Sequence, residues 1–248
     1  MPPAMARPLR AVFFDVDDTL YSTTGFASGA RRRAVEAMAA LGGLRVTADE
    51  LLAELREVIA EFGSNHDAHF DRLLRRFPED ALGGHSRSVV VAAGVAAYHD
   101  TKQEGLEPFP GVREGLRALH GGTPLVLGVI TEGLAVKQAE KLLRLGVYPY
   151  LDRSAIFISD PIGISKPNPK LWLRACTAIG VPPAEAMYVG DNPVNDVVPA
   201  RKVGMRAVRM RSPGGKCAAA DSPVPPDHEV ANFTEFLEVL RREYGIAV

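Results

Sequence analysis

The feature that most limits the folds open to this chain is a recurring pair of segments: a short apolar run, then a stretch with helical periodicity. The runs are AVFF at 11–14, PLVLGVI at 124–130, AIFI at 155–158, AMYV at 186–189 and RAVRM at 206–210. Helices cover both faces of a buried parallel sheet, so its strands are typically short apolar runs without regular polar alternation. The pattern predicts an α/β fold with a doubly wound parallel sheet.

The spacing of the runs is broken once. About a hundred residues separate the first run from the second, far more than the dozen or so that a crossover connection needs. That interval holds no convincing strand, but helical patterns occur over 26–41, from Thr47 with its TADE capping box, over 69–77 and over 86–99. We therefore expect an α/β core made of residues 1–20 and 108–248, with an inserted α-helical cap domain over 21–107.

Composition narrows the classes of partner. Lys and Arg number 29 against 30 Asp and Glu, a net charge of −1, and no basic block marks a face that could bind nucleic acid. The longest apolar stretch, Val89–Tyr98, is about half of a membrane span. Two cysteines are too few for a disulfide framework. We expect a cytoplasmic monomer or homodimer without a nucleic-acid or membrane partner.

Polar residues follow four of the apolar runs, at the sheet edge where ligands bind in doubly wound folds. They are Asp15 and Asp17 in DVDDT, Thr131 followed by Glu132, Lys166 in KPNP, and Asp191 and Asp196 in GDNPVND. Each motif alone has a structural explanation: a turn former, a helix cap or a solvated lysine. The predicted fold nevertheless gathers all four motifs on one edge.

Together these residues are suited to moving a phosphoryl group. A carboxylate that attacks a phosphate ester meets like charge, which costs about 4 kcal/mol for each unit pair at about 4 Å and an effective dielectric near 20. Lys166 supplies one positive charge, and a divalent ion held by Asp15 and Asp191 supplies two more. Oxygen ligands without clustered His or Cys favour Mg²⁺.

The ordered set DVDDT, Thr131, KPNP and GDNPVND resembles the haloacid dehalogenase superfamily of phosphotransferases, over nearly the whole chain. The helical insertion after the first motif resembles the C1-type cap of subfamily I. Within it, GSNHDAHFDRLLRR at 63–76 and AYHDTK at 97–102 are similar to a group of uncharacterised hydrolases. Those are related in turn to N-acylneuraminate-9-phosphatase-like enzymes.

The resemblance implies roles for the acidic residues. Asp15 would be the nucleophile that forms an aspartyl-phosphate. Asp17 would be first the general acid and then the base, which requires surroundings that raise its pKa, and its backbone carbonyl would bind the metal. Asp191 would complete the protein ligands of Mg²⁺, and Asp196 would orient bound water or Lys166.

The resemblance also implies roles in substrate binding. Thr131, Glu132 through its backbone amide, and Lys166 would hold the transferring phosphoryl group. Glu132 departs from relatives that often carry Asp or Asn there, which leaves its side chain without an assigned role. Cap residues would select the substrate, with Asn65, His66 and His69 as candidates. For either histidine taken alone, a packed or surface position is the more common explanation.

These observations predict an Mg²⁺-dependent phosphatase of small phosphorylated metabolites. A 2-haloacid dehalogenase of the superfamily is disfavoured, because the enzymes that displace halide lack the second aspartate that this chain has in Asp17. A phosphomutase stays open as an alternative. A signalling receiver domain would be about half as long, with its phosphorylated Asp after a middle strand. A catalytically silent binding module would not need every motif residue. The pattern does not identify the metabolite.

Overall fold

The computed structural model describes residues 8–63, 66, 68–103 and 106–247, which fold as two compact units. The core unit consists of Met1–Thr24 and Leu106–Val248, and the helical unit of Gly25–Gly105. Each has its own hydrophobic core. None of the helices in the described ranges combines the length and apolarity that crossing a membrane requires.

The core unit is built on a six-stranded parallel sheet in the order β3-β2-β1-β4-β5-β6. Its strands are β1 (Ala11–Phe14), β2 (Val126–Thr131), β3 (Ile156–Ile158), β4 (Ala186–Gly190), β5 (Arg206–Met210) and β6 (His228–Val230). The predicted α/β class and parallel sheet are confirmed. Strand β6 was not anticipated, because its three residues, HEV, form no apolar run.

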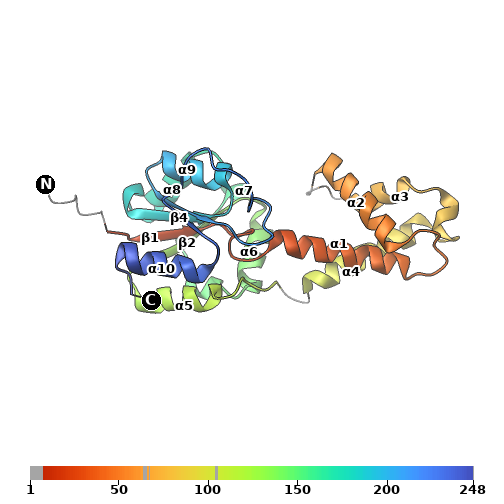
Figure 1. Ribbon diagram of the computed structural model, residues 1–248, viewed down its shortest axis with the longest axis horizontal. Coiled ribbons are helices and arrows are strands. Elements are labelled where there is room, and N and C mark those ends of the chain that lie inside the picture. Colours follow the sequence, from red (N-terminus) through yellow and green to blue (C-terminus); the bar gives the residue numbers. More distant parts are fainter. Residues whose placement is uncertain (1–7, 64–65, 67, 104–105, 248) are drawn as a thin grey trace. The chain divides into compact units, whose positions relative to one another are not determined.

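Helices cover both faces of this sheet (Figure 1), α5 and α10 on one face and α8 and α9 on the other. Phe14 of β1 packs on Phe233 and Phe236 of α10, whereas Phe13 packs on Phe157 of β3. The helical elements are α5 (Val112–Gly122), α6 (Ala135–Arg144), η2 (Tyr148–Tyr150), α7 (Ser159–Ile162), α8 (Lys170–Ala178), η3 (Pro183–Glu185), η4 (Pro193–Val197), α9 (Val198–Lys202) and α10 (Phe233–Tyr244).

Strand order determines where a ligand can bind. Strand β1 lies between β2 and β4, and the chain proceeds outward from it in opposite directions, through β2 to β3 and later through β4 to β6. The connecting loops diverge at such a point and leave a crevice beyond the carboxyl end of the central strand. The segments that follow β1, β2 and β4 therefore surround this crevice.

The helical unit contains α1 (Thr23–Ala39), α2 (Ala48–Phe62), α3 (His69–Arg75), η1 (Glu79–Leu82) and α4 (Arg87–Gln103). Helix α1 begins in the core unit, where the Asp18 carboxylate accepts hydrogen bonds from the amide and hydroxyl of Thr24. Thr47 and Glu50 form the expected capping box at the start of α2. Apolar faces of these helices bury Met38, Leu51 and Leu73.

Candidate active site

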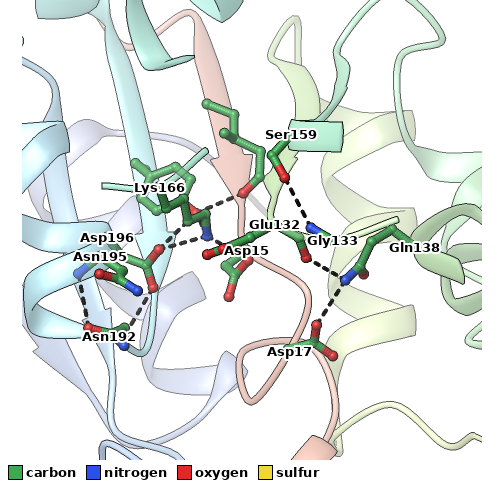
Figure 2. A network of polar contacts seen from close by, with 12 residues as sticks. Asp15, Asp17, Glu132, Gly133, Gln138, Ser159, Lys166, Asn192, Asn195 and Asp196 are labelled. Carbon is green, nitrogen blue, oxygen red and sulfur yellow. Dashed lines mark hydrogen bonds and ion pairs between the residues drawn. The ribbon is translucent and has the colours of Figure 1, made fainter. Parts of the chain in front are cut away.

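Lys166 is the centre of a buried polar cluster beyond the carboxyl ends of β1 and β4 (Figure 2). Its Nζ donates to Asp15 Oδ1 and to Asp196 Oδ1, each at 2.7 Å, and to Tyr188 Oη at 2.6 Å. Asp15 directly follows β1, and its backbone amide donates to the Val189 carbonyl of β4 at 2.8 Å. The three protons of the ammonium thus all have acceptors.

Three carboxylates meet in this cluster. Asp15, Asp191 and Asp196 each offer an oxygen, and these oxygens lie within 4.8 Å of one another. Asp196 Oδ1 accepts from Lys166, and its Oδ2 accepts from the Asn192 amide at 2.9 Å, so both of its oxygens already have donors. Asp15 and Asp191 are therefore the better placed of the three to bind a cation.

Burial and crowding of negative charge set the acidity of these groups. Burial, together with the charges of Asp196 and Asp15, raises the pKa of Asp191 to about 8. Burial also raises the pKa of Asp15, against the opposing charge of Lys166. Burial lowers the pKa of Lys166, but the charges of Asp15 and Asp196 and their hydrogen bonds outweigh burial and raise it, so the ammonium keeps its proton. A divalent cation would relieve the repulsion among these oxygens, and an all-oxygen donor set suits Mg²⁺.

The end of β2 offers hydrogen-bond donors on the other side of Asp15. Thr131 is fully buried, and its hydroxyl has no hydrogen-bond partner within the described ranges. The Gly133 amide donates to Ser159 Oγ at 3.0 Å. The Glu132 side chain is exposed, while its carbonyl accepts from Gln138 Nε2 at 2.6 Å. An unpaired buried hydroxyl beside a carboxylate cluster fits an oxyanion such as a phosphoryl group.

Asp17 points toward Gln138 of α6, to the other side of the cluster from Lys166 (Figure 2). The Lys141 ammonium donates to both of its oxygens, at 2.6 and 2.7 Å, and Gln138 donates at 3.1 Å. Hydroxyls of Tyr21 and Thr23 donate to Oδ1 at 2.7 and 2.6 Å. Four side chains therefore hold this carboxylate.

The expectation that its surroundings raise the pKa of Asp17 is wrong for this arrangement. Burial raises the pKa of Asp17, but the Lys141 charge and the hydrogen bonds from Lys141, Thr23 and Tyr21 together outweigh burial and lower the pKa below its ordinary value. Asp17 is consequently an ionised carboxylate here. That state suits the base of a water-activating step, and a proton must be acquired before Asp17 can act as an acid.

Sequence reasoning missed four members of this site: Lys141, Gln138, Tyr188 and Ser159. Gln138 and Lys141 lie three residues apart, so they share one face of α6, but a polar helix face is ordinary on a protein surface. Tyr188 lies inside an apolar run and reads as a core residue. A polar hydroxyl in the middle of a buried strand was the one signal that could have drawn attention to it.

The candidate cap residues belong to the helical unit. Asn65 lies outside the described residues. His66 Nε2 accepts from Arg72 Nε at 3.0 Å, and His69 Nε2 lies 2.7 Å from the Gly63 carbonyl. These contacts are within the helical unit, at the C-terminal end of α2 and in α3, and a role of either histidine in substrate contact stays a prediction.

Comparison with known proteins identifies the family. A model of the haloacid dehalogenase-like hydrolases matches residues 9–204. The chain belongs to this hydrolase family. It is 44% identical over 237 residues to a glyceraldehyde 3-phosphate phosphatase of Methanopyrus kandleri, covering 94% of this chain and 97% of the relative. A glyceraldehyde 3-phosphate phosphatase of Pyrococcus furiosus is 40% identical over 241 residues, 96% of each chain.

A solved structure with the same fold is the 2-haloacid dehalogenase from Pseudomonas syringae pv. Tomato DC3000. It has a TM-score of 0.57 and 29% identity, covering 95% of this chain and 99% of that one. The predicted superfamily is thus confirmed. The narrower likeness to N-acylneuraminate-9-phosphatase-like enzymes stays a prediction.

Proposed function

We propose that this protein is an Mg²⁺-dependent phosphatase that hydrolyses a small phosphate monoester through an aspartyl-phosphate on Asp15. The observation that carries the proposal is the buried cluster in which Lys166 and two further carboxylates surround Asp15. A phosphate ester brings negative charge to a carboxylate, so a site for this reaction must supply cations beside its nucleophile. This cluster has one such cation and a set of oxygens that suits a second.

The residues around Asp15 would have different roles in phosphoryl transfer. Lys166 donates to Asp15 Oδ1 at 2.7 Å and so holds the nucleophilic carboxylate in place. The Thr131 hydroxyl and the nearby backbone amides bind the transferring oxygens. Asp15 and Asp191, with the Asp17 backbone carbonyl, would hold Mg²⁺, which when bound offsets the charge of the phosphoryl group. Asp196 keeps Lys166 in place through their 2.7 Å ion pair.

Asp17 would act as the general acid and then as the general base of the reaction. It would give a proton to the leaving oxygen as the aspartyl-phosphate forms, and then take one from the water that hydrolyses this intermediate. The hydrogen bonds from α6 and from Tyr21 and Thr23 favour the ionised form, which is the state required in the second step. A dehalogenase needs no such proton donor, so Asp17 favours ester hydrolysis.

Glyceraldehyde 3-phosphate is the first substrate to test, because two relatives that carry its phosphatase name align over nearly the full length of this chain. The helical unit would act as the cap that contacts the leaving group, with His66 and His69 as candidate contacts.

The test uses purified protein with glyceraldehyde 3-phosphate and with an aryl phosphate, in Mg²⁺ and in excess chelator. We expect phosphate release that requires Mg²⁺, and a rate at least about 10³-fold lower for Asp15→Asn. Acid quenching during turnover should leave one phosphoryl group on the peptide that contains Asp15. Asp221→Asn, which changes an exposed loop aspartate, is the matched control and should keep full activity.

Two results would overturn the proposal: turnover that survives both chelation and Asp15→Asn, or no release of phosphate from either ester. Accumulation of an isomeric ester in place of free phosphate would instead identify a phosphomutase.

A further inference from the structure

Tyr188 is a buried polar residue that the reaction scheme does not use. It lies in the middle of β4, only 1% of its surface is exposed, and its ring packs edge-on against Trp172 with 5.4 Å between the centroids. An apolar residue of similar shape would pack equally well there. A hydroxyl in the core needs partners, and the partners of this one lie inside the candidate active site.

The hydroxyl of Tyr188 connects two motifs. Its Oη accepts from Lys166 Nζ at 2.6 Å and donates to the Ile130 carbonyl at 2.9 Å, with Asp196 Oδ1 farther away at 3.2 Å. Ile130 directly precedes Thr131 in β2. The Tyr188 hydroxyl is therefore hydrogen-bonded both to the backbone of β2 and to Lys166, which follows β3 in the chain. Because the hydroxyl proton has the carbonyl as its nearest acceptor, a lone pair remains for the ammonium.

We propose that Tyr188 is a positioning residue for Lys166. Its hydroxyl is the uncharged one of three acceptors, with the carboxylates of Asp15 and Asp196, that form a cradle around the ammonium and hold it beside Asp15. This inference rests on the proposed function, in which Lys166 offsets the charge of the transferring phosphoryl group. The two carboxylates attract the ammonium, but two acceptors alone do not fix the orientation of its three N–H groups. The tyrosine oxygen supplies the third point, and its own position is fixed by the sheet.

The cradle also indicates how the site accepts a substrate. All three ammonium protons have protein acceptors, so a phosphoryl oxygen that approaches Lys166 must share or replace one of them. The Tyr188 hydroxyl is the one uncharged acceptor of the three and is held by the backbone of β2. It therefore keeps the Lys166 ammonium at a fixed distance from the end of β2, where Thr131 lies, while the charge on the carboxylate and phosphoryl oxygens changes during the reaction.

The test compares wild type with Tyr188→Phe, which keeps the ring and its packing on Trp172 and removes the hydroxyl. We expect kcat for glyceraldehyde 3-phosphate or an aryl phosphate to fall about 10- to 100-fold, the range for a hydrogen bond to a charged group. KM should change much less, because a misdirected cation chiefly weakens the transition state. Tyr244→Phe is the control: it removes another partnered tyrosine hydroxyl, 3.1 Å from His228, and should leave kcat unchanged.

A double-mutant cycle separates positioning from a general structural effect. In the Lys166→Met background, Tyr188→Phe should cost less than about threefold, because the group that it positions is gone. If Tyr188→Phe costs as much there as in wild type, or leaves kcat of the wild-type background unchanged, the assignment is wrong.

A second readout does not depend on activity. In protein labelled with ¹⁵N-lysine, the Lys166 ammonium signal, assigned by its loss in Lys166→Met, should exchange slowly with water and should exchange at least about tenfold faster in Tyr188→Phe, since one of three hydrogen bonds is lost. Unaltered exchange overturns the inference. If the wild type hydrolyses no phosphate ester, the proposed function fails by itself, and the exchange measurement still decides whether Tyr188 orders Lys166.

Discussion

At the scale of single residues, the environment of Asp17 favours one step of the proposed reaction over the other. The two steps are formation of the aspartyl-phosphate and its hydrolysis. The first step needs protonated Asp17 as an acid, and the second needs ionised Asp17 as a base. The Lys141 ammonium donates to both oxygens of the carboxylate, which favours the ionised form. The pair is about a quarter exposed, so solvent screens it in part. Removal of the lysine charge should shift Asp17 toward its protonated form.

We predict that Lys141→Met moves the acidic limb of the pH–rate profile to higher pH. The sign follows from the charge: the ammonium favours ionised Asp17 and lowers its pKa, so its loss raises that pKa and delays ionisation of the base as pH rises. An aryl phosphate should show this limb most clearly, because its good leaving group needs no acid and dephosphorylation then limits kcat. The measurement is kcat against pH for wild type and variant.

Lys137→Met serves as the control for that measurement, because Lys137 is an exposed lysine of the same helix. Its profile should match that of the wild type. A limb that stays in place in Lys141→Met would mean that Asp17 is not the base whose ionisation the profile reports.

At the scale of elements, five of the six strands and their parallel arrangement could be predicted, because strands buried on both faces are typically short apolar runs. For the same reason we predicted that Asp15, Thr131 and Asp191 lie near one edge, since Asp15 and Thr131 directly follow an apolar run and Asp191 follows one after a single intervening residue. The order of the strands and the short β6 were not predicted. The contacts of Lys141 and Tyr188 could not be predicted this way. They depend on how α6 and β4 are oriented around the strand ends, and neither residue type is unusual in its own segment.

The turn from β4 into η4 gives a prediction at this scale. Gly190 ends the strand, and a Cβ there would lie 2.5 Å from Asp196 Oδ2, far inside contact distance. Gly190→Ala should therefore push Asp196 away from Lys166 and from the Asn192 amide. We expect kcat to fall about 100-fold, as for a misplacement of about 1 Å near a reacting group, while the fold is retained.

Gly121→Ala is the matched change, because a Cβ at that position of α5 meets nothing within 4 Å. It should keep full activity and a similar melting temperature. Wild-type activity in Gly190→Ala would show that the position of Asp196 does not matter for the reaction.

At the scale of the whole molecule, the acidic cluster connects stability to pH and to metal. Asp191 has a pKa of about 8, against an ordinary value of 3.8, and burial raises the pKa of Asp15 as well. Between these ordinary and raised values the folded protein binds more protons than the unfolded chain. The free energy of unfolding therefore falls as pH rises through that window. The lowered pKa of Asp17 acts at more acidic pH, where its stabilising contribution is lost as pH falls.

We predict that the metal-free protein melts at a lower temperature at about pH 8 than at about pH 5, and that saturating Mg²⁺ removes this difference. Mg²⁺ binds ionised carboxylates, so its stabilisation should grow with pH. At about 100 times its dissociation constant it adds about 2.7 kcal/mol, or about 5 to 10 °C for a chain of this size. Calorimetry of the core unit's transition measures the effect. Asp191→Asn should lose the Mg²⁺ shift and the part of the pH slope that Asp191 contributes, while the contribution of Asp15 stays. Equal Mg²⁺ shifts at the two pH values, or the same shift in Asp191→Asn, would place the ion outside this cluster.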